Sequence, residues 1–454
     1  MNCVRHLLVA LALVLVTAGS AEAKLVVGNV VLHDASKTRE ETVRSLARLE
    51  LGSPVDYGVL QATQERLEAS DLFESADAWV DLPREEATRK MYLDEGTEPV
   101  DVHVRLKEKQ SWFAVPMGSL GAGDMAIGAA FADVNLAGRG TQLLFAGQYG
   151  ESKTYLVAGV RQPQLPGAPI ALSLSGVWRL EDFNFYENHR KVLTVPTRIL
   201  GVEAQGGWVA TPNLRLMVGI LYNRHSTFGP KFVDPTVPTP AYNTGSGNVV
   251  VGQFLLQYDD TSAPQGLRRG TRFSLRNEIS DGALGSDFDY LKVDLKLELF
   301  GQWWKTYPSL ALHFLTNHPT SQRGVPLTQL LRAGGNELRG FNTWEFRGDT
   351  ILTLQLEEQM PVFTDLKVPL TSVKFNLAAA VFADGGVILE RQKGAGTGAT
   401  TVGQNKVGLH AGVGVGVRVV LPGIAIPALK ADFAYGIDVK DFAFTLSIAG
   451  GGIN

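Results

Sequence analysis

Sixteen short segments of alternating character fill the last 344 residues of this chain, and this pattern limits the folds that the chain can adopt. In the segment at 287–301, Lys292 and Asp294 face one way, whereas Leu291 and Val293 face the other. A period of two residues is typical of β-strands with one wet and one apolar face. A soluble β-sandwich and the wall of a membrane barrel share this period. The alternation alone therefore leaves both folds open.

The lengths of the segments are those of membrane strands. Each has about the 9 to 11 residues that a tilted strand needs to cross a bilayer, or slightly more. We place them at 111–120, 124–134, 140–149, 153–162, 168–180, 196–209, 212–223, 247–260, 269–279, 287–301, 306–316, 349–361, 372–389, 407–421, 427–436 and 440–449.

Charge density divides the chain near residue 110. Residues 24–110 hold 30 charged residues in 87, whereas residues 111–454 hold only 56 in 344. An even-stranded closed sheet satisfies every backbone group in lipid, which an open sheet cannot do. We therefore expect an all-β transmembrane barrel of about 16 antiparallel strands at 111–454, preceded by one small α+β domain at 24–110.

Residues 1–23 have the pattern of a secretory signal peptide. Arg5 precedes an apolar stretch, and residues 21–23 read Ala-Glu-Ala, which suits a signal peptidase. We expect cleavage before Lys24. The single cysteine, Cys3, lies in this leader, so the mature chain is expected to have neither disulfides nor thiolate metal sites.

The small domain is predicted to contain a strand, two helices and two further strands. Apolar periodicity places them at 25–33, 37–51, 59–69, 73–82 and 100–106. Leu51 belongs to the apolar face of the first helix, and Gly52 stands where that helix is expected to stop. A charged stretch at 83–99 is expected to form a long hairpin loop.

Several residues of this domain resemble the POTRA domain, the periplasmic module of the BamA/TamA-like outer-membrane superfamily. The matching positions are Gly28-Asn29, Gly52, Leu67 followed by Asp71-Leu72-Phe73, and the closing run at 104–108. An unrelated module with the same order of elements is the alternative.

A turn and two motifs in the charge-poor region extend this resemblance. Residues 133–140 resemble the N-L-x-G-x-G turn after the second barrel strand of this superfamily, with Asn135, Leu136, Gly138 and Gly140 at the matching positions. Glycines suit the positive φ angles of a tight turn. An ordinary glycine turn is the alternative interpretation.

The segment at 317–348 contains Arg339-Gly340-Phe341, which resembles the R-G-F/Y motif of the sixth extracellular loop of the superfamily. Residues 382–386 resemble its F-x-D-x-G motif, with Phe382, Asp384 and Gly386 at the matching positions. By resemblance, these residues form a clasp that holds the loop inside the barrel.

A buried arginine needs carboxylate partners, because an unpaired charge away from water is costly. Glu357 shares the polar parity of the strand at 349–361, and Asp384 shares the parity of Phe382 in the next strand. We therefore expect Arg339 to meet Glu357 and Asp384. A solvated loop arginine is the alternative.

The seam between the first and last strands of a barrel joins distant parts of the chain. The first strand contains Pro116, which lacks an N–H, and the last strand runs into Gly450, Gly451 and Gly452. Both features are expected to weaken this junction. Proline and glycine that merely end the strands are the alternative.

The sequence indicates no enzyme. It contains no H-E-x-x-H pair, no G-x-S-x-G elbow and no phosphate loop, so we expect no catalytic residues, no metal and no cofactor. The formal charge of −4 gives no basic surface for nucleic acid.

The resemblance implies an outer-membrane barrel in a Gram-negative cell, with its POTRA domain in the periplasm. Its implied function is to insert or translocate other outer-membrane or surface proteins through a POTRA-assisted lateral seam. Its expected partners are outer-membrane lipids, unfolded β-rich clients, and periplasmic or lipoprotein accessory factors. The resemblance implies a lone POTRA domain, and the sequence ends at Asn454 without a terminal aromatic residue, unlike many members of this superfamily. A passive channel or structural barrel remains the alternative.

Overall fold

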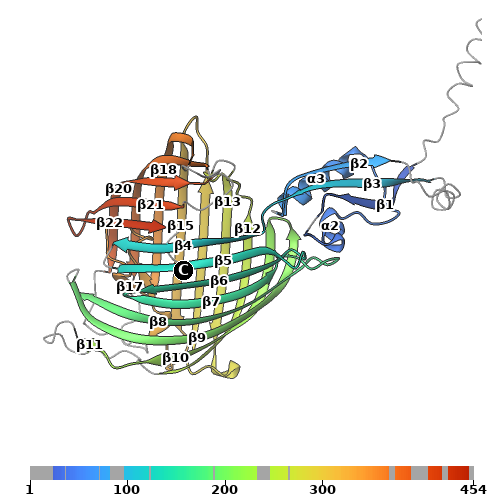
Figure 1. Ribbon diagram of the computed structural model, residues 1–454. Helices are drawn as coiled ribbons and strands as arrows, with labels where there is room; N and C mark the ends of the chain where they lie inside the picture. Colours follow the sequence, from blue (N-terminus) through green and yellow to red (C-terminus); the bar gives the residue numbers. More distant parts are fainter. Residues whose placement is uncertain are drawn as a thin grey trace, which may run out of the picture. The chain divides into compact units, whose positions relative to one another are not determined.

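A closed sheet of long strands dominates the protein in a computed structural model (Figure 1). The structure describes residues 24–35, 37–70, 72–81, 97–121, 124–187, 190–232, 246–263, 266–367, 374–389, 407–421 and 428–448. The signal peptide expected at 1–23 and the loop residues 83–96 lie outside this description.

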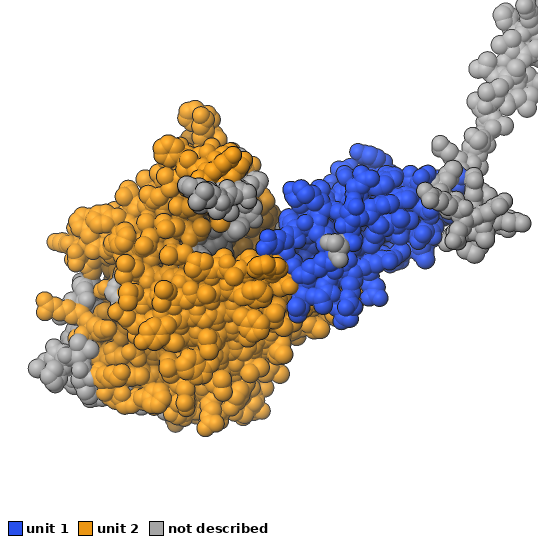
Figure 2. Space-filling view, viewed as in Figure 1, with its two compact units in different colours: residues 1–111, 135–140 blue, residues 112–134, 141–454 orange. Residues whose placement is uncertain are grey.

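Two units make up the chain, and Figure 2 colours them separately. The first comprises Met1–Ser111 and Asn135–Gly140, and the second comprises Trp112–Val134 and Thr141–Asn454. The first unit thus takes in the turn that follows the second barrel strand.

The N-terminal domain has the expected order of elements. Its elements are β1 (Lys24–His33), α2 (Glu40–Ala47), α3 (Tyr57–Ala69), β2 (Phe73–Asp81) and β3 (Thr97–Glu108). The sheet order is β1-β3-β2, with β3 parallel to β1 and antiparallel to β2. Neither described helix is long and apolar enough to span a membrane.

Strand β3 supplies the centre of the core of this domain. Val100, Val102, Val104 and Leu106 alternate along it, and each is at least 98% buried. Strict alternation places all four side chains on one face of the sheet. The apolar pattern at 100–106 therefore identified the central strand, although it missed the residues that β3 adds at both ends.

The first helix is shorter than the sequence suggested. It ends at Ala47, because Arg48 adopts a left-handed conformation with φ of 54° and donates its N–H to the carbonyl of Arg44 at 3.0 Å. Gly52, with φ of 82°, lies in the turn beyond and does not stop the helix. Leu51, expected on the apolar helical face, is 64% exposed. Both expectations were wrong, since a non-glycine residue took the left-handed position.

Sixteen long antiparallel strands form the closed barrel, which confirms the expected strand number. They are β4 (Trp112–Gly121), β5 (Asp124–Leu136), β6 (Thr141–Gly150), β7 (Lys153–Gln162), β8 (Ile170–Glu187), β9 (Arg190–Thr211), β10 (Leu214–Thr227), β12 (Gly247–Asp259), β13 (Gly270–Ser280), β14 (Tyr290–Phe300), β15 (Tyr307–Pro319), β18 (Thr350–Lys367), β19 (Lys374–Leu389), β20 (Gly408–Val420), β21 (Leu429–Gly436) and β22 (Asp441–Ile448). A two-residue strand, β11 (Lys231–Phe232), adds to the edge of β9.

The two faces of the barrel wall differ as the alternation predicts. On β14, Leu291 and Leu299 point outward and are each 41% exposed. On the same strand, Lys292 and Asp294 point inward, where the Lys292 Nζ lies 3.7 Å from a Glu278 carboxylate oxygen. The apolar face thus suits lipid, and the inner face keeps its charges close to partners.

Strands β8 and β9 extend farther than the sequence indicated, to Glu187 and from Arg190. The predicted strands ended at residue 180 and began at residue 196. The structure instead packs Phe183, Phe185 and Leu193 into a buried cluster with Leu327 of a distant loop. Burial of these apolar side chains explains why the hairpin continues as paired strands.

Candidate functional site: a loop held inside the barrel

The long connection between β15 and β18, residues 320–349, contains the arginine singled out by the sequence and is called the clasp loop below. It includes η2 (Leu327–Gln329), β16 (Leu331–Ala333) and β17 (Phe346–Gly348), and β16 pairs with β17. This small hairpin gives the loop a regular base from which Arg339 projects.

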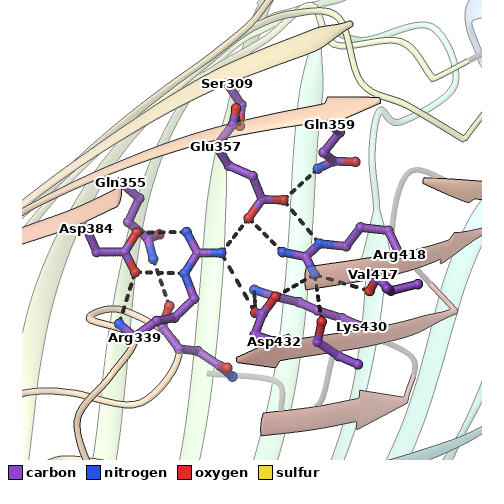
Figure 3. A network of polar contacts seen from close by, with 12 residues as sticks. Ser309, Arg339, Gln355, Glu357, Gln359, Asp384, Val417, Arg418, Lys430 and Asp432 are labelled. Carbon is purple, nitrogen blue, oxygen red and sulfur yellow. Dashed lines mark hydrogen bonds and ion pairs between the residues drawn. The ribbon is translucent and has the colours of Figure 1, made fainter. Parts of the chain in front are cut away.

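Arg339 makes three hydrogen bonds to Asp384 on β19 (Figure 3). Its Nε and Nη2 atoms each donate to one carboxylate oxygen at 2.7 Å, and its backbone N–H donates at 3.0 Å. The Asp384 side chain is fully buried, and that of Arg339 is 3% exposed. This bidentate pair fixes both the position and the orientation of the loop.

Glu357 on β18 is the second expected partner, and the structure places it against the Nη1 atom of Arg339. Burial alone would disfavour the charge on Arg339. The hydrogen bonds and charges of Asp384 and Glu357 outweigh this effect and raise the pKa of Arg339 above its ordinary value. The guanidinium therefore stays charged at every physiological pH.

Three further charged residues on neighbouring strands join this site, and sequence reasoning missed them. Arg418 on β20 donates to Glu357 from its Nε at 3.1 Å and from its Nη2 at 2.8 Å. Its Nη1 donates to Asp432 on β21 at 2.6 Å. The Lys430 Nζ lies 3.1 Å from the other Asp432 oxygen. Arg418 is the bulkiest fully buried side chain of the described residues.

The network is electrically balanced. It holds three cations and three carboxylates, namely Arg339, Arg418, Lys430, Glu357, Asp384 and Asp432 (Figure 3). Buried charges are tolerated when each is paired and hydrogen-bonded. Four strands and one loop thus meet in a single neutral cluster.

Phe382 lies under the arginine. The Cζ atom of Arg339 stands 3.5 Å from the centre of the Phe382 ring, which is a close cation–π contact. On β20, Gly412 leaves room for the loop, because a Cβ atom there would overlap the carbonyl oxygen of Arg339. Gly414 similarly makes room for the Phe382 ring.

The two glycines that the sequence placed in the clasp, Gly340 and Gly386, also allow close packing. Gly340, with φ of 98°, would place a Cβ 2.8 Å from the backbone nitrogen of Gly436. A Cβ on Gly386 would lie 3.2 Å from the Leu338 side chain. A positive φ and tight surroundings together favour glycine at position 340.

Phe341 anchors the apolar side of the clasp loop. It is 2% exposed and packs with Leu338, Phe346 and Ile351 in one buried cluster. Its ring meets that of Phe346 edge to face at 4.9 Å. Polar and apolar contacts thus hold the same turn of the loop.

A second anchor holds the clasp loop to a different part of the barrel wall. The Arg332 Nη2 donates to Glu181 on β8 at 2.6 Å, and Glu181 is 2% exposed. The guanidinium of Arg332 also lies 4.3 Å from the centre of the Phe183 ring. No local pattern in the sequence predicts this pair, whose members lie 151 residues apart. The loop is therefore attached to β8 as well as to β18–β21.

A polar cavity of about 460 Å³ lies inside the barrel beside the clasp loop. Its lining includes Lys292 and Asp294 from β14, Arg332 from the loop, and Ser119 and Ser447 from the first and last barrel strands. The cavity therefore reaches the strands that close the barrel.

The closing ladder is short. Strand β22 pairs with β4 at four positions in the described residues, from Thr445 opposite Gly121 to Ile448 opposite Gly118. Eight positions pair β22 with β21, and ten pair β4 with β5. Pro116 lies beyond the last of the four pairs and faces Ala129 of β5. The other predicted seam residues, at 450–452, lie outside the described residues.

The predicted turn motif lies in the first unit. The Asn135 side chain donates to the Thr38 hydroxyl at 2.8 Å and accepts from the Gly140 N–H at 2.8 Å. Asn135 is 3% exposed, whereas Leu136 is 36% exposed. The asparagine therefore both closes the turn and ties it to the segment before α2.

Gly138 provides the closest approach in this turn. Its carbonyl accepts from the Arg39 N–H at 2.8 Å and from the Thr42 hydroxyl at 3.0 Å. Its φ is 72°, and a Cβ there would overlap the carbonyl oxygen of Lys37. The glycine is thus required by backbone packing as well as by its turn conformation.

The sequence of the chain matches a family model described as the Omp85 superfamily domain over residues 135–448. The chain belongs to the Omp85 superfamily. Among solved structures, this Omp85 chain is similar to BamA from Haemophilus ducreyi lacking POTRA domains 1-3. The two share 16% identity with a TM-score of 0.63, and the match covers 95% of this chain and 85% of that one.

CdiB from Acinetobacter baumannii is also similar to this Omp85 protein, with 12% identity and a TM-score of 0.60. The match covers 94% of this chain and 74% of that one. A search of curated proteins gave no match. At these identities the structural likenesses establish the fold. Membership of the Omp85 superfamily places the barrel in a Gram-negative outer membrane.

Proposed function

We propose that this Omp85 protein inserts or exports other β-rich outer-membrane or surface proteins through its closing seam. The N-terminal domain then acts as a single POTRA domain that receives unfolded clients in the periplasm. Outer-membrane lipids and accessory periplasmic proteins or lipoproteins complete its partners. Because the described site holds structural ion pairs, we propose no catalytic step and no cofactor for this function.

The four-pair ladder between β22 and β4 is the observation that carries this proposal. Within the described residues, fewer paired positions hold this junction than hold the ladders on either side of it, and we infer that it is the least costly place to open the barrel. The polar cavity reaches Ser119 and Ser447 at this junction. An opened seam would offer unpaired backbone groups to a client strand, with water available on the inner side.

The N-terminal domain offers two sheet edges for β-augmentation, in which an extended client adds a strand. The β1 edge already binds a neighbouring segment, since the Val27 N–H donates to Ser53 and the Val55 N–H donates to Leu25, both at 2.9 Å. We therefore assign client capture to the other edge, Phe73–Asp81 of β2.

A cysteine pair across the seam tests the proposal. Ser119 and Ser447 lie directly opposite each other, so their Cβ atoms are about 4.5 to 5.5 Å apart, close enough for a disulfide with a small adjustment. Oxidation of S119C/S447C should stop client insertion, and reductant should restore it.

The matched control joins β21 to β22 at Ala434 and Ala443, which also lie opposite each other. Locking this ladder leaves the seam free and should leave insertion unchanged. Full insertion by a verified S119C/S447C cross-linked barrel would exclude lateral opening.

A passive channel is the second candidate, and the polar lumenal cavity favours it. The clasp loop, attached to β8 through Glu181 and to β19 through Asp384, argues against free passage. Conductance in planar bilayers distinguishes the two functions. A large steady conductance that the seam lock does not change would support the channel.

A further inference from the structure

An apolar groove of about 690 Å³ crosses the outer face of strands β4–β9. Its walls include Phe131, Phe145, Leu156 and Leu200, which are exposed by 38%, 49%, 60% and 53% respectively. The volume lies within the range of about 300 to 1,000 Å³ that is typical of ligand sites. The groove faces the apolar surroundings of the barrel and not its lumen.

The depth of the groove comes from small residues set beside large ones. Ala158 on β7 lies opposite Phe145 on β6 and opposite Gly176 on β8. Leu156, one outward position along, lies opposite Trp178. The small residues therefore form the floor of the groove and the large residues form its walls, which leaves room for a long, thin apolar chain.

Two arginines lie at the β9 end of this groove. Arg224 on β10 is directly opposite Leu200, and Arg198 lies two residues before Leu200 on the same strand and face. Both are exposed. Within the described part of the chain, neither guanidinium has an ion-pair partner. His225, next to Arg224, contacts Thr328, so these arginines lie toward the end of the barrel that carries the clasp loop.

Exposed cations beside an apolar lipid-facing surface are costly unless an anion meets them. Phosphate is the anion that the planar guanidinium group binds best, through two parallel hydrogen bonds. The acyl chain of the same molecule would fill the apolar groove. We propose that the groove binds one phosphate-bearing anionic lipid, with its chain along β5–β9 and its phosphate against Arg198 and Arg224.

Native mass spectrometry of the full mature protein in detergent tests this site. The probe is phosphatidylglycerol with two palmitoyl chains, and phosphatidylcholine with the same chains is the zwitterionic comparison. We expect one phosphatidylglycerol to bind tightly and phosphatidylcholine to bind more weakly. The variant R198Q/R224Q should bind phosphatidylglycerol roughly thirtyfold more weakly, as expected for two basic residues that face an anionic lipid.

Matched variants separate the groove from general effects. Lys305→Gln removes an exposed cation in a distant turn and should leave the affinity unchanged. Ala158→Phe should block the groove, whereas Ala204→Phe enlarges an exposed outward residue outside its lining and should not. A heat-modifiable gel shift verifies that each variant barrel is folded.

Three results would overturn the proposal. If R198Q/R224Q bound phosphatidylglycerol as tightly as the unaltered protein does, the two arginines would have no role in binding. If dipalmitoylglycerol, which lacks a phosphate, bound as tightly as phosphatidylglycerol, the groove would bind acyl chains alone and would not recognise phosphate. Full displacement of the lipid by inorganic phosphate would show a site for free phosphate.

Discussion

Arg339 of the clasp loop and Asp384 of β19 are joined by three hydrogen bonds, although 45 residues separate them in the sequence. Two of these bonds are parallel and 2.7 Å long, and the third comes from the loop backbone. The pair therefore fixes the course of the loop as well as the position of one side chain. It belongs to a network that reaches four adjacent strands.

The loss of this contact should free the clasp loop. Arg339→Ala leaves Glu357 and Asp384 near each other without their shared cation, which should cost about 3 to 5 kcal/mol of docking free energy. The barrel itself should still close. Limited proteolysis should then cut within residues 320–349 much faster than in the unaltered protein.

Glu337→Gln is the control in the same loop, because the one ion pair of Glu337 within the described residues is a 3.8 Å contact with His313, and its side chain is partly exposed. Its digestion pattern should stay close to that of the unaltered protein. A pattern for Arg339→Ala that equals this control would count against the clasp.

Arg418 and Asp432 should stabilise the barrel as a pair. Each single change, Arg418→Met or Asp432→Leu, takes one charged partner away from a buried charge, whereas the double change removes both charges of the pair. A double-mutant cycle by thermal or denaturant unfolding should give a coupling free energy of about 1 to 3 kcal/mol. Additive effects would mean that the two side chains do not act together.

Gly412 should be intolerant of even one methyl group. A Cβ at this position overlaps the Arg339 carbonyl oxygen, so Gly412→Ala should expose the clasp loop to protease. Gly385→Ala, on the adjacent strand, is the control because a Cβ there meets nothing within 4 Å. Equal protease resistance of the two variants would contradict the close approach of loop and wall.

Much of the barrel could be predicted because alternation is a local property of the chain. The expected strand at 153–162 coincides with β7, and Arg339, Asp384 and Glu357 meet as motif and parity suggested. Arg418 lies on β20, where most of the other inward positions are glycine. The alternation of inward and outward residues therefore showed that Arg418 points inward but not which carboxylate it meets. Only the register between strands brings it to Asp432.

The misplaced end of α2 has a different cause. Apolar spacing continues to Leu51, but the chain leaves the helix at Arg48, whose left-handed conformation depends on the surrounding packing. The anchor between Arg332 and Glu181 similarly depends on the path of the loop through the barrel. Such contacts are not encoded in any local pattern.

The β2 edge of the N-terminal domain should be the edge that accepts clients. Prolines scanned across 75–79 remove backbone donors and should abolish cross-linking to an extended client peptide. Prolines scanned across 29–32 of β1 are the comparison and should have little effect. Circular dichroism should confirm that each domain remains folded. Unimpaired cross-linking in both sets would exclude capture at either edge.

The outer-membrane proteome after depletion of this protein tests the proposed function most directly. We expect selective loss of particular β-rich outer-membrane or surface proteins, with accumulation of their unfolded forms in the periplasm. Re-expression of the unaltered protein should restore them, and the oxidised S119C/S447C variant should not. An unchanged outer-membrane protein composition, together with altered solute flux across the membrane, would contradict the insertion account.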